Sequence, residues 1–205
     1  MAQRPCWAEI SLTQLKENLS LVRRHVGAER KVLAVVKADA YGHGAVPVSR
    51  ALEAAGVDAL GVCCVAEGVE LREGGVKAPI VVLTGFFPGE EAELLEHNLT
   101  PGITDVGQAE TLDRAAKAAG RKLKIHVKID SGMGRLGVPP QDVPRLIEAL
   151  EAAPSLELEG LFTHFSSSEN FTVARTEEQL ACFEKVRQQM AGRGFDPPLV
   201  HMANT

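Results

Sequence analysis

The chain has few aromatic residues and no excess of positive charge, and the second property narrows its function. Phe, Trp and Tyr together make up 4% of its 205 residues, and the formal net charge is −5. Proteins that bind nucleic acid or an anionic membrane surface carry basic patches. Because the sequence contains no basic cluster, we expect neither nucleic acid nor a membrane as a partner.

Two further absences concern the cellular compartment. No segment approaches the roughly 20 consecutive apolar residues of a transmembrane helix, and the first residues lack the apolar core of a signal peptide. The four cysteines show no Cys-x-x-Cys spacing. We therefore predict a cytoplasmic protein without a metal site, whose cysteines are small buried hydrophobic residues.

One stretch, residues 31–44, organises the rest of the prediction. It reads Lys31-Val-Leu-Ala-Val-Val-Lys-Ala-Asp-Ala-Tyr-Gly-His-Gly44. Its apolar run, residues 32–36, does not alternate, which is typical of a strand buried on both faces of a parallel sheet. Lys37 follows at the carboxyl end of this strand, where open sheets and barrels place their chemistry.

Two interpretations of Lys37 remain open on local grounds. Its stem can pack on the core while its ammonium group reaches water. Alternatively, an amine held against apolar walls is favoured in its neutral form, which reacts with aldehydes to give a Schiff base. The aldehyde of pyridoxal phosphate is one such partner.

Strand and helix patterns alternate along the whole chain. A capping box formed by Ser11 and Gln14 opens the first helix. From residue 32 onward we count seven strands and six intervening helices, which predicts parallel strands with right-handed crossovers. The first strand-to-helix turn, where a doubly wound sheet usually carries a phosphate-binding Gly-x-Gly-x-x-Gly, has no such motif. The fold class is therefore predicted as α/β, of the (β/α)8 TIM-barrel type, incomplete at about seven strands.

The predicted domain spans residues 1–205, and residues 1–10 contribute a short strand, Trp7 to Ile10, that precedes the barrel. In a barrel, the carboxyl ends of the strands converge on one mouth. The polar residues expected there are Lys37, Arg135, His164, His201, Asn204 and Thr205. One face of the strand predicted at 123–129 carries Lys124, His126, Lys128 and Asp130, which form either an ion network or part of a functional site.

Two long motifs in the same order resemble those of the alanine racemases. The first is the lysine segment at 31–44, and the second is Lys128-Ile-Asp-Ser-Gly-Met-Gly-Arg-Leu-Gly137. The resemblance implies that Lys37 carries pyridoxal phosphate as an internal aldimine and serves as a catalytic base. It implies that Tyr41 contacts the cofactor phosphate, and that Arg135 contacts the cofactor's phenolic oxygen and the substrate carboxylate. Lys128 matches a lysine that is carbamylated in many members.

The later segments also match the family. His164, in Thr163-His-Phe165, matches a histidine that supports the second catalytic base. His201-Met-Ala-Asn-Thr205 resembles His-x-x-Asn-Ser, so Asn204 and Thr205 are implied to reach the cofactor. Thr205 replaces the usual serine but keeps the hydroxyl group.

The resemblance covers only the N-terminal part of such an enzyme. The family's second base is a tyrosine that comes from the partner subunit of a homodimer, whereas the single tyrosine here is Tyr41. The C-terminal β domain is also missing. We therefore expect the N-terminal portion of an enzyme that interconverts L-alanine and D-alanine for cell-wall peptidoglycan, inactive when this portion is alone.

Three alternatives remain open. The first is an amino-acid racemase of broader specificity, and the second is a pyridoxal-phosphate homeostasis protein built on the same barrel without turnover. The third is a metal-dependent hydrolase that uses His126, His164 and His201, although no His-x-His pair or carboxylate bridge is present.

Overall fold

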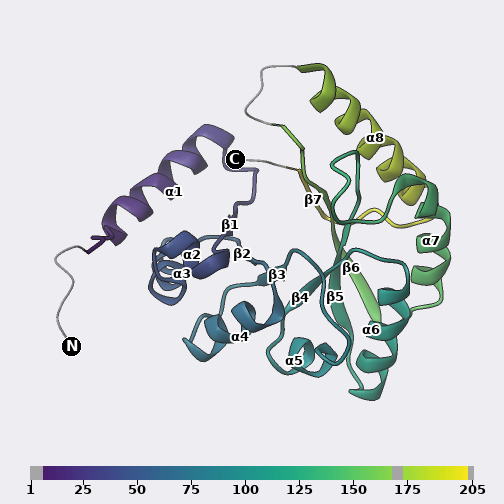
Figure 1. Ribbon diagram of the computed structural model, residues 1–205, viewed down its shortest axis with the longest axis horizontal. Helices are drawn as coiled ribbons and strands as arrows, with labels where there is room; N and C mark the ends of the chain where they lie inside the picture. The colour runs from purple at the N-terminus through teal and green to yellow at the C-terminus, as the bar shows by residue number, and fades with distance from the viewer. Residues whose placement is uncertain (1–6, 168–172, 203–205) are drawn as a thin grey trace. The chain divides into compact units, whose positions relative to one another are not determined.

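The computed structural model describes residues 7–167 and 173–202 (Figure 1). The chain divides into two compact units, Met1–Ile80 and Val81–Thr205. Each unit is an alternation of strands and helices, and each is described in turn.

The first unit begins with helix α1 (Leu12–Val26). Its N-cap is Ser11, whose Oγ accepts a hydrogen bond from Gln14 N at 3.2 Å, as the capping box predicts. The Gln14 side chain does not complete the box, because it donates to Asn18 instead. Of the apolar face expected on this helix, Leu19 is buried and Val22 is 45% exposed.

Two parallel strands form the sheet of the first unit. They are β1 (Leu33–Val35) and β2 (Ala59–Val62), followed by helices α3 (Ala45–Ala54) and α4 (Val65–Glu73). The prediction that the strand at 32–36 is buried on both faces is wrong, because Val35 is 39% exposed. β1 is the end strand of the sheet, so only β2 covers one of its edges.

The second unit contains the remaining strands, all parallel. They are β3 (Ile80–Val82), which starts at the last residue of the first unit, β4 (Thr100–Ile103), β5 (Leu123–Lys128), β6 (Leu156–Thr163) and β7 (Leu199–Met202). The helices between them are α5 (Glu91–Glu96), α6 (Gly107–Ala118), α7 (Val143–Glu151) and α8 (Val173–Ala191). Side chains such as Ile125, Leu112 and Phe183 are fully buried and form its core.

The strands follow one another in the sheet in chain order, from β1 to β7. Seven parallel strands with intervening helices are an α/β fold of the TIM-barrel type that is one strand short of eight. The predicted fold class is thus confirmed. The short strand expected at residues 7–10 is not formed, because no described segment supplies backbone hydrogen bonds to it, and residues 1–6 lie outside the described range.

A β-bulge interrupts the pairing of β5 with β6. Ile125 pairs with Leu158, but His126 pairs with Gly160, so Glu159 is the extra residue. A Cβ atom on Gly160 would lie 2.5 Å from atoms of the His126 ring. Glycine at this position is therefore what allows the imidazole to lie against β6.

Substituting Gly160→Ala should destabilise the second unit. The added methyl group would overlap the buried His126 ring, and such overpacking lowers the free energy of unfolding by about 1–3 kcal/mol. Urea unfolding followed by circular dichroism measures this change. Gly192→Ala is the matched control, because its Cβ would have no neighbour closer than 3.4 Å. Equal stabilities of the two variants would contradict this interpretation of the bulge.

Candidate functional site

Lys37 lies directly after the first strand. Val36 N donates to Gly61 O at 2.8 Å, which extends the pairing of β1 with β2 up to the lysine. The Lys37 side chain is half-buried, and the residue opens α2 (Lys37–Gly42). The structure therefore places this amine at the carboxyl end of β1, as predicted.

The backbone after Lys37 forms a left-handed turn. Ala38, Asp39, Ala40 and Tyr41 have φ values of 51°, 54°, 51° and 56°. For residues other than glycine this conformation costs about 1–2 kcal/mol each, and strain of this kind clusters at functional sites. The sequence did not predict this conformation, because alanine and tyrosine rarely adopt it and a run of four such residues has no local signal.

Hydrogen bonds to two carboxylates offset this strain. Glu67 Oε1 accepts from Ala38 N at 2.8 Å, and Asp39 Oδ1 accepts from Ala45 N at 2.6 Å. Glu67 also accepts from Cys63 N at 2.6 Å, so one carboxylate joins the carboxyl ends of β1 and β2. Glu67 is a site residue that the sequence did not reveal.

Tyr41, predicted to bind the cofactor phosphate, lies at the end of the left-handed run. Its side chain is 61% exposed, whereas the neighbouring Ala40 is buried. The phenol is thus presented to solvent from the same short turn that follows Lys37. Its contact with a phosphate stays a prediction.

The second unit presents Arg135 on a closed loop. Asp130 Oδ1 accepts from Gly132 N at 3.0 Å and from Gly134 N at 2.9 Å. The two ends of the loop are joined by backbone hydrogen bonds, one of them from Val138 N to Lys128 O at 2.8 Å. Arg135 is exposed on this loop. A loop held in this way can offer a guanidinium group to an anionic ligand without first having to fold.

Gly137 allows this loop to close. Its φ is +124°, and a Cβ atom there would lie 2.7 Å from Asp130 N. Only glycine combines this backbone conformation with such a close approach of two backbone segments.

Hydroxyl groups join the Arg135 loop to the end of β6. Thr163 Oγ1 donates to Ile129 O at 2.9 Å, so Ser131 Oγ, 2.7 Å away, is the donor to Thr163 Oγ1. His164 follows Thr163 and is half-buried. The predicted residues Arg135 and His164 are thus carried by two segments that are bonded to each other.

A cluster of aromatic rings and a lysine lies between β5, β6 and β7. Phe162 stacks on His201 with ring centroids 4.7 Å apart and planes 4° from parallel. Lys128 is 7% exposed, and its Nζ lies 4.9 Å from the centroid of the Phe162 ring. Lys128, Phe162 and His201 are therefore brought together as neighbours.

The polar face predicted on β5 serves partly as an ion network. Lys124 Nζ lies 2.6 Å from Glu159 Oε1, and His126 Nε2 lies 3.5 Å from Glu159 Oε2. His126 Nδ1 lies 3.0 Å from His201 Nε2. Of the two interpretations left open for this face, the ion network fits Lys124 and His126, which both lie beside Glu159.

Both buried imidazoles are neutral at neutral pH. Burial, together with repulsion by a protonated His126 or by Lys128, lowers the pKa of His201 to about 3. Burial also lowers the pKa of His126, an effect that Glu159 opposes. The protonation of these rings is therefore fixed by the fold rather than by solution pH near 7.

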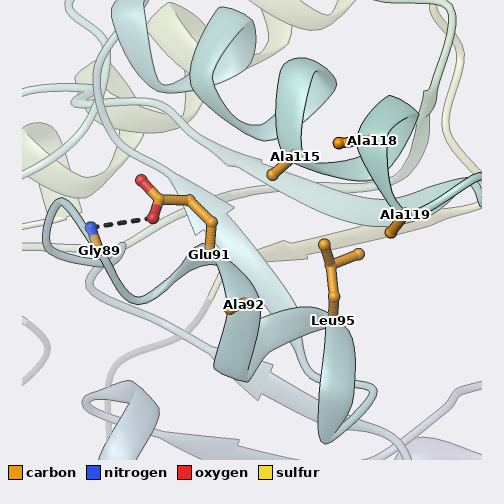
Figure 2. Close-up of a pocket in the computed structure, with 7 residues that line it drawn as sticks. All are labelled: Gly89, Glu91, Ala92, Leu95, Ala115, Ala118 and Ala119. Atoms are coloured by element: carbon orange, nitrogen blue, oxygen red, sulfur yellow. Dashed lines mark hydrogen bonds between the residues drawn. The ribbon is translucent and has the colours of Figure 1, made fainter.

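The outer helices of the second unit border a depression of about 460 Å³ between α5 and α6. Figure 2 shows that small side chains line it, together with Leu95 and Glu91, whose Oε2 accepts from Gly89 N at 2.9 Å. None of the predicted site residues lines it. We therefore do not assign the site to this depression.

The described residues contain no group of three or more His, Cys, Asp or Glu side chains arranged to hold a metal ion. None of the helices in the same part of the chain is long and apolar enough to span a membrane. The three described cysteines, Cys63, Cys64 and Cys182, form no disulfide bond and are half-buried rather than fully buried. Asn204 and Thr205 lie outside the described residues. The predicted closeness of Lys37 to Arg135 stays a prediction.

The fold and the placement of the polar residues define an α/β barrel-type domain with its candidate chemistry at the carboxyl ends of the strands. The family described as "Alanine racemase, N-terminal domain" matches residues 10–205, so the chain belongs to this family. It is 44% identical over 214 residues to the alanine racemase of Geobacter sp. (strain M21), covering all of this chain and 55% of that protein.

Solved structures agree with this assignment. An alanine racemase from Clostridium difficile 630 in complex with cycloserine matches with a TM-score of 0.93 and 35% identity, over all of this chain and 56% of that one. One from Bacillus anthracis with bound L-Ala-P matches with a TM-score of 0.88 and 30% identity, over 95% of this chain and 50% of that one. The chain spans about half the length of the relatives it matches.

The neutral state of His201 predicts that stability falls with acid. The unfolded chain takes up a proton on this ring near pKa 6.5, whereas the folded chain does so only near pKa 3. Stability is therefore fully present above the unfolded value and is lost as the pH falls toward the folded one, by up to about 1.4 kcal/mol per pH unit.

Urea unfolding between neutral pH and about pH 5 tests this prediction, because most carboxyl groups titrate below that range. The wild-type chain should lose stability more steeply than His201→Asn. If the free energy of unfolding depends on pH equally in the two chains, the prediction for His201 is contradicted.

Proposed function

We propose that this chain is the pyridoxal-phosphate-binding part of an alanine racemase, in which Lys37 holds the cofactor covalently. The observation that carries the proposal is the family match over residues 10–205 together with a half-buried amine directly after β1. When bound, pyridoxal phosphate withdraws electrons from the substrate Cα and so makes its proton easier to remove.

The side chains present fit such a group. A primary amine suits the cofactor's aldehyde, and the exposed phenol of Tyr41 suits its phosphate. In the second unit, the exposed guanidinium of Arg135 suits a phenolate or a carboxylate, because it offers a fork of N–H donors. Asn204 and Thr205 are assigned to the cofactor by resemblance, and His164 is assigned to the cofactor site and to support of the second catalytic base.

The roles of these residues follow from their chemistry. Lys37 would hold the cofactor, and its amine would serve as the base that removes or returns the Cα proton on one face of the substrate. Arg135 orients the substrate by its carboxylate. The opposite face needs a second base, which we assign to the part of the relatives that this chain does not cover, contributed across a homodimer.

The covalent step has a direct test. Incubation with pyridoxal phosphate followed by borohydride should fix one cofactor per chain, located on Lys37 by peptide mass spectrometry. Lys37→Ala should lose this adduct completely, because no other amine occupies that position. Lys31→Ala is the matched control, since Lys31 is an exposed lysine beside the same strand, and it should keep the adduct.

The outcomes separate the remaining alternatives. Two results together would support the proposal. Residues 1–205 should form the Lys37 adduct without racemising alanine, and a chain of the length of the relatives should racemise it. Racemisation of many amino acids would indicate broader specificity, whereas an adduct without turnover at full length would indicate a homeostasis protein. An adduct spread evenly over surface lysines would overturn the proposal.

Lys128 is proposed to be carbamylated. It is nearly buried and lies over the Phe162 ring, and the carbamate would replace a cation by an anion able to orient Arg135. Isotopically labelled bicarbonate should give one carbamate NMR signal that is lost in Lys128→Met and kept in Lys122→Met, an exposed lysine. Absence of any signal from the wild-type chain would exclude the modification under those conditions.

The biological setting is proposed on the same basis. A cytoplasmic homodimer would supply D-alanine for cell-wall peptidoglycan. Its substrate would be a free amino acid, which fits a cationic loop that can bind a carboxylate.

A further inference from the structure

Three polar side chains from neighbouring strands lie in a row whose effect on the site the proposed function does not specify. Glu159 on β6 lies 3.5 Å from His126 Nε2 on β5, and His126 Nδ1 lies 3.0 Å from His201 Nε2 on β7. His126 is 1% exposed, and its Nε2 has no hydrogen-bond partner that meets ordinary geometry. His201 begins the His-Met-Ala-Asn-Thr segment that the family resemblance assigns to the cofactor.

The two rings share one hydrogen. Both imidazoles are neutral, so each has one N–H and one lone pair, and the short contact between them requires a single N–H on one side. Two arrangements satisfy this requirement. His126 Nδ1–H donates to His201 Nε2, or His201 Nε2–H donates to His126 Nδ1.

The charge of Glu159 decides between these arrangements. If His126 carried its hydrogen on Nδ1, the lone pair of its Nε2 would face a carboxylate oxygen, which is repulsive. With the hydrogen on Nε2, a positively polarised N–H group lies beside the same oxygen, and the interaction is attractive even without hydrogen-bond geometry. Lys124 pairs with the other carboxylate oxygen at 2.6 Å and holds Glu159 in place.

The charged groups on the other strands do not reverse this preference. As a free ammonium group, Lys128 on β5 disfavours a protonated His201 ring and leaves its two neutral forms to be chosen by hydrogen bonding. Phe162 on β6 stacks on His201 and offers no hydrogen-bonding atom in its side chain. Among the described residues, the contact with His126 is thus the one that selects the form of His201.

We infer that Glu159, acting through His126, is a positioning residue that fixes His201 in its Nε2–H form and leaves His201 Nδ1 as a hydrogen-bond acceptor. A partner of that nitrogen must then be a donor. This inference goes beyond the proposed function, and only its consequence for cofactor binding rests on that proposal. The β-bulge at Glu159 and the missing side chain of Gly160 are what bring the carboxylate and the ring together.

NMR of the ring nitrogens tests the inference without cofactor. Protonated and bare nitrogens of neutral imidazoles have well-separated shifts, so histidine-labelled protein reports each form directly. His126→Asn and His201→Asn assign the signals by their loss. We expect both rings of the wild-type chain as Nε2–H. Nδ1–H on either ring would overturn the inference before any further variant is made.

Glu159→Gln then tests the cause. The amide is similar in shape but neutral, and its NH2 group can donate to His126 Nε2. His126 and His201 should therefore both change to Nδ1–H. Glu157→Gln, a neighbouring exposed carboxylate on the same strand, should leave both rings unchanged. If His201 keeps its Nε2–H form in folded Glu159→Gln, the inference that Glu159 controls His201 through His126 is overturned.

The Lys37 adduct, measured separately on the same proteins, distinguishes the two proposals. If the Lys37 adduct forms but the two histidines carry their hydrogens on Nδ1, only the inference about Glu159 and His201 is refuted. If both histidines carry their hydrogens on Nε2 but no adduct forms, only the cofactor proposal is refuted.

Discussion

The loops at the carboxyl ends of the strands depend on one kind of interaction, in which a side-chain oxygen accepts hydrogen bonds from main-chain N–H groups. Where a strand ends, its backbone donors lose their ladder partners and need others. Glu67 serves the turn after β1, Gln108 the turn after β4, Asp130 the loop after β5 and Gln179 the turn after β6. The segments that carry the candidate chemistry are therefore held by acceptors that take no part in it.

The sequence predicted the repeating part of this structure well, because burial imposes a period on helices and strands. The seven strands predicted from residue 32 onward are observed, and the strand predicted at 123–129 is found at Leu123–Lys128. The position of Lys37 after its strand also followed from pattern alone. These features depend on local sequence and on which face of each element is buried.

The features that the sequence did not reveal depend on contacts between distant residues. Glu67 resembles any other helix-surface glutamate until its two backbone partners, Ala38 and Cys63, are known. The bulge at Glu159 leaves no periodic signal, since it shifts one residue within an otherwise regular strand. The exposure of Val35 follows from β1 being an end strand, which no count of apolar residues could show.

The left-handed turn has a consequence for the reach of Lys37. The ladder hydrogen bond of Val36 fixes the backbone before the lysine, and a run of opposite handedness, which cannot extend into an ordinary helix, fixes it behind. Motion of the amine is thereby confined to the torsions of its own flexible side chain. Covalent capture of an aldehyde at this position would then cost side-chain entropy alone, with the main chain already in its final conformation.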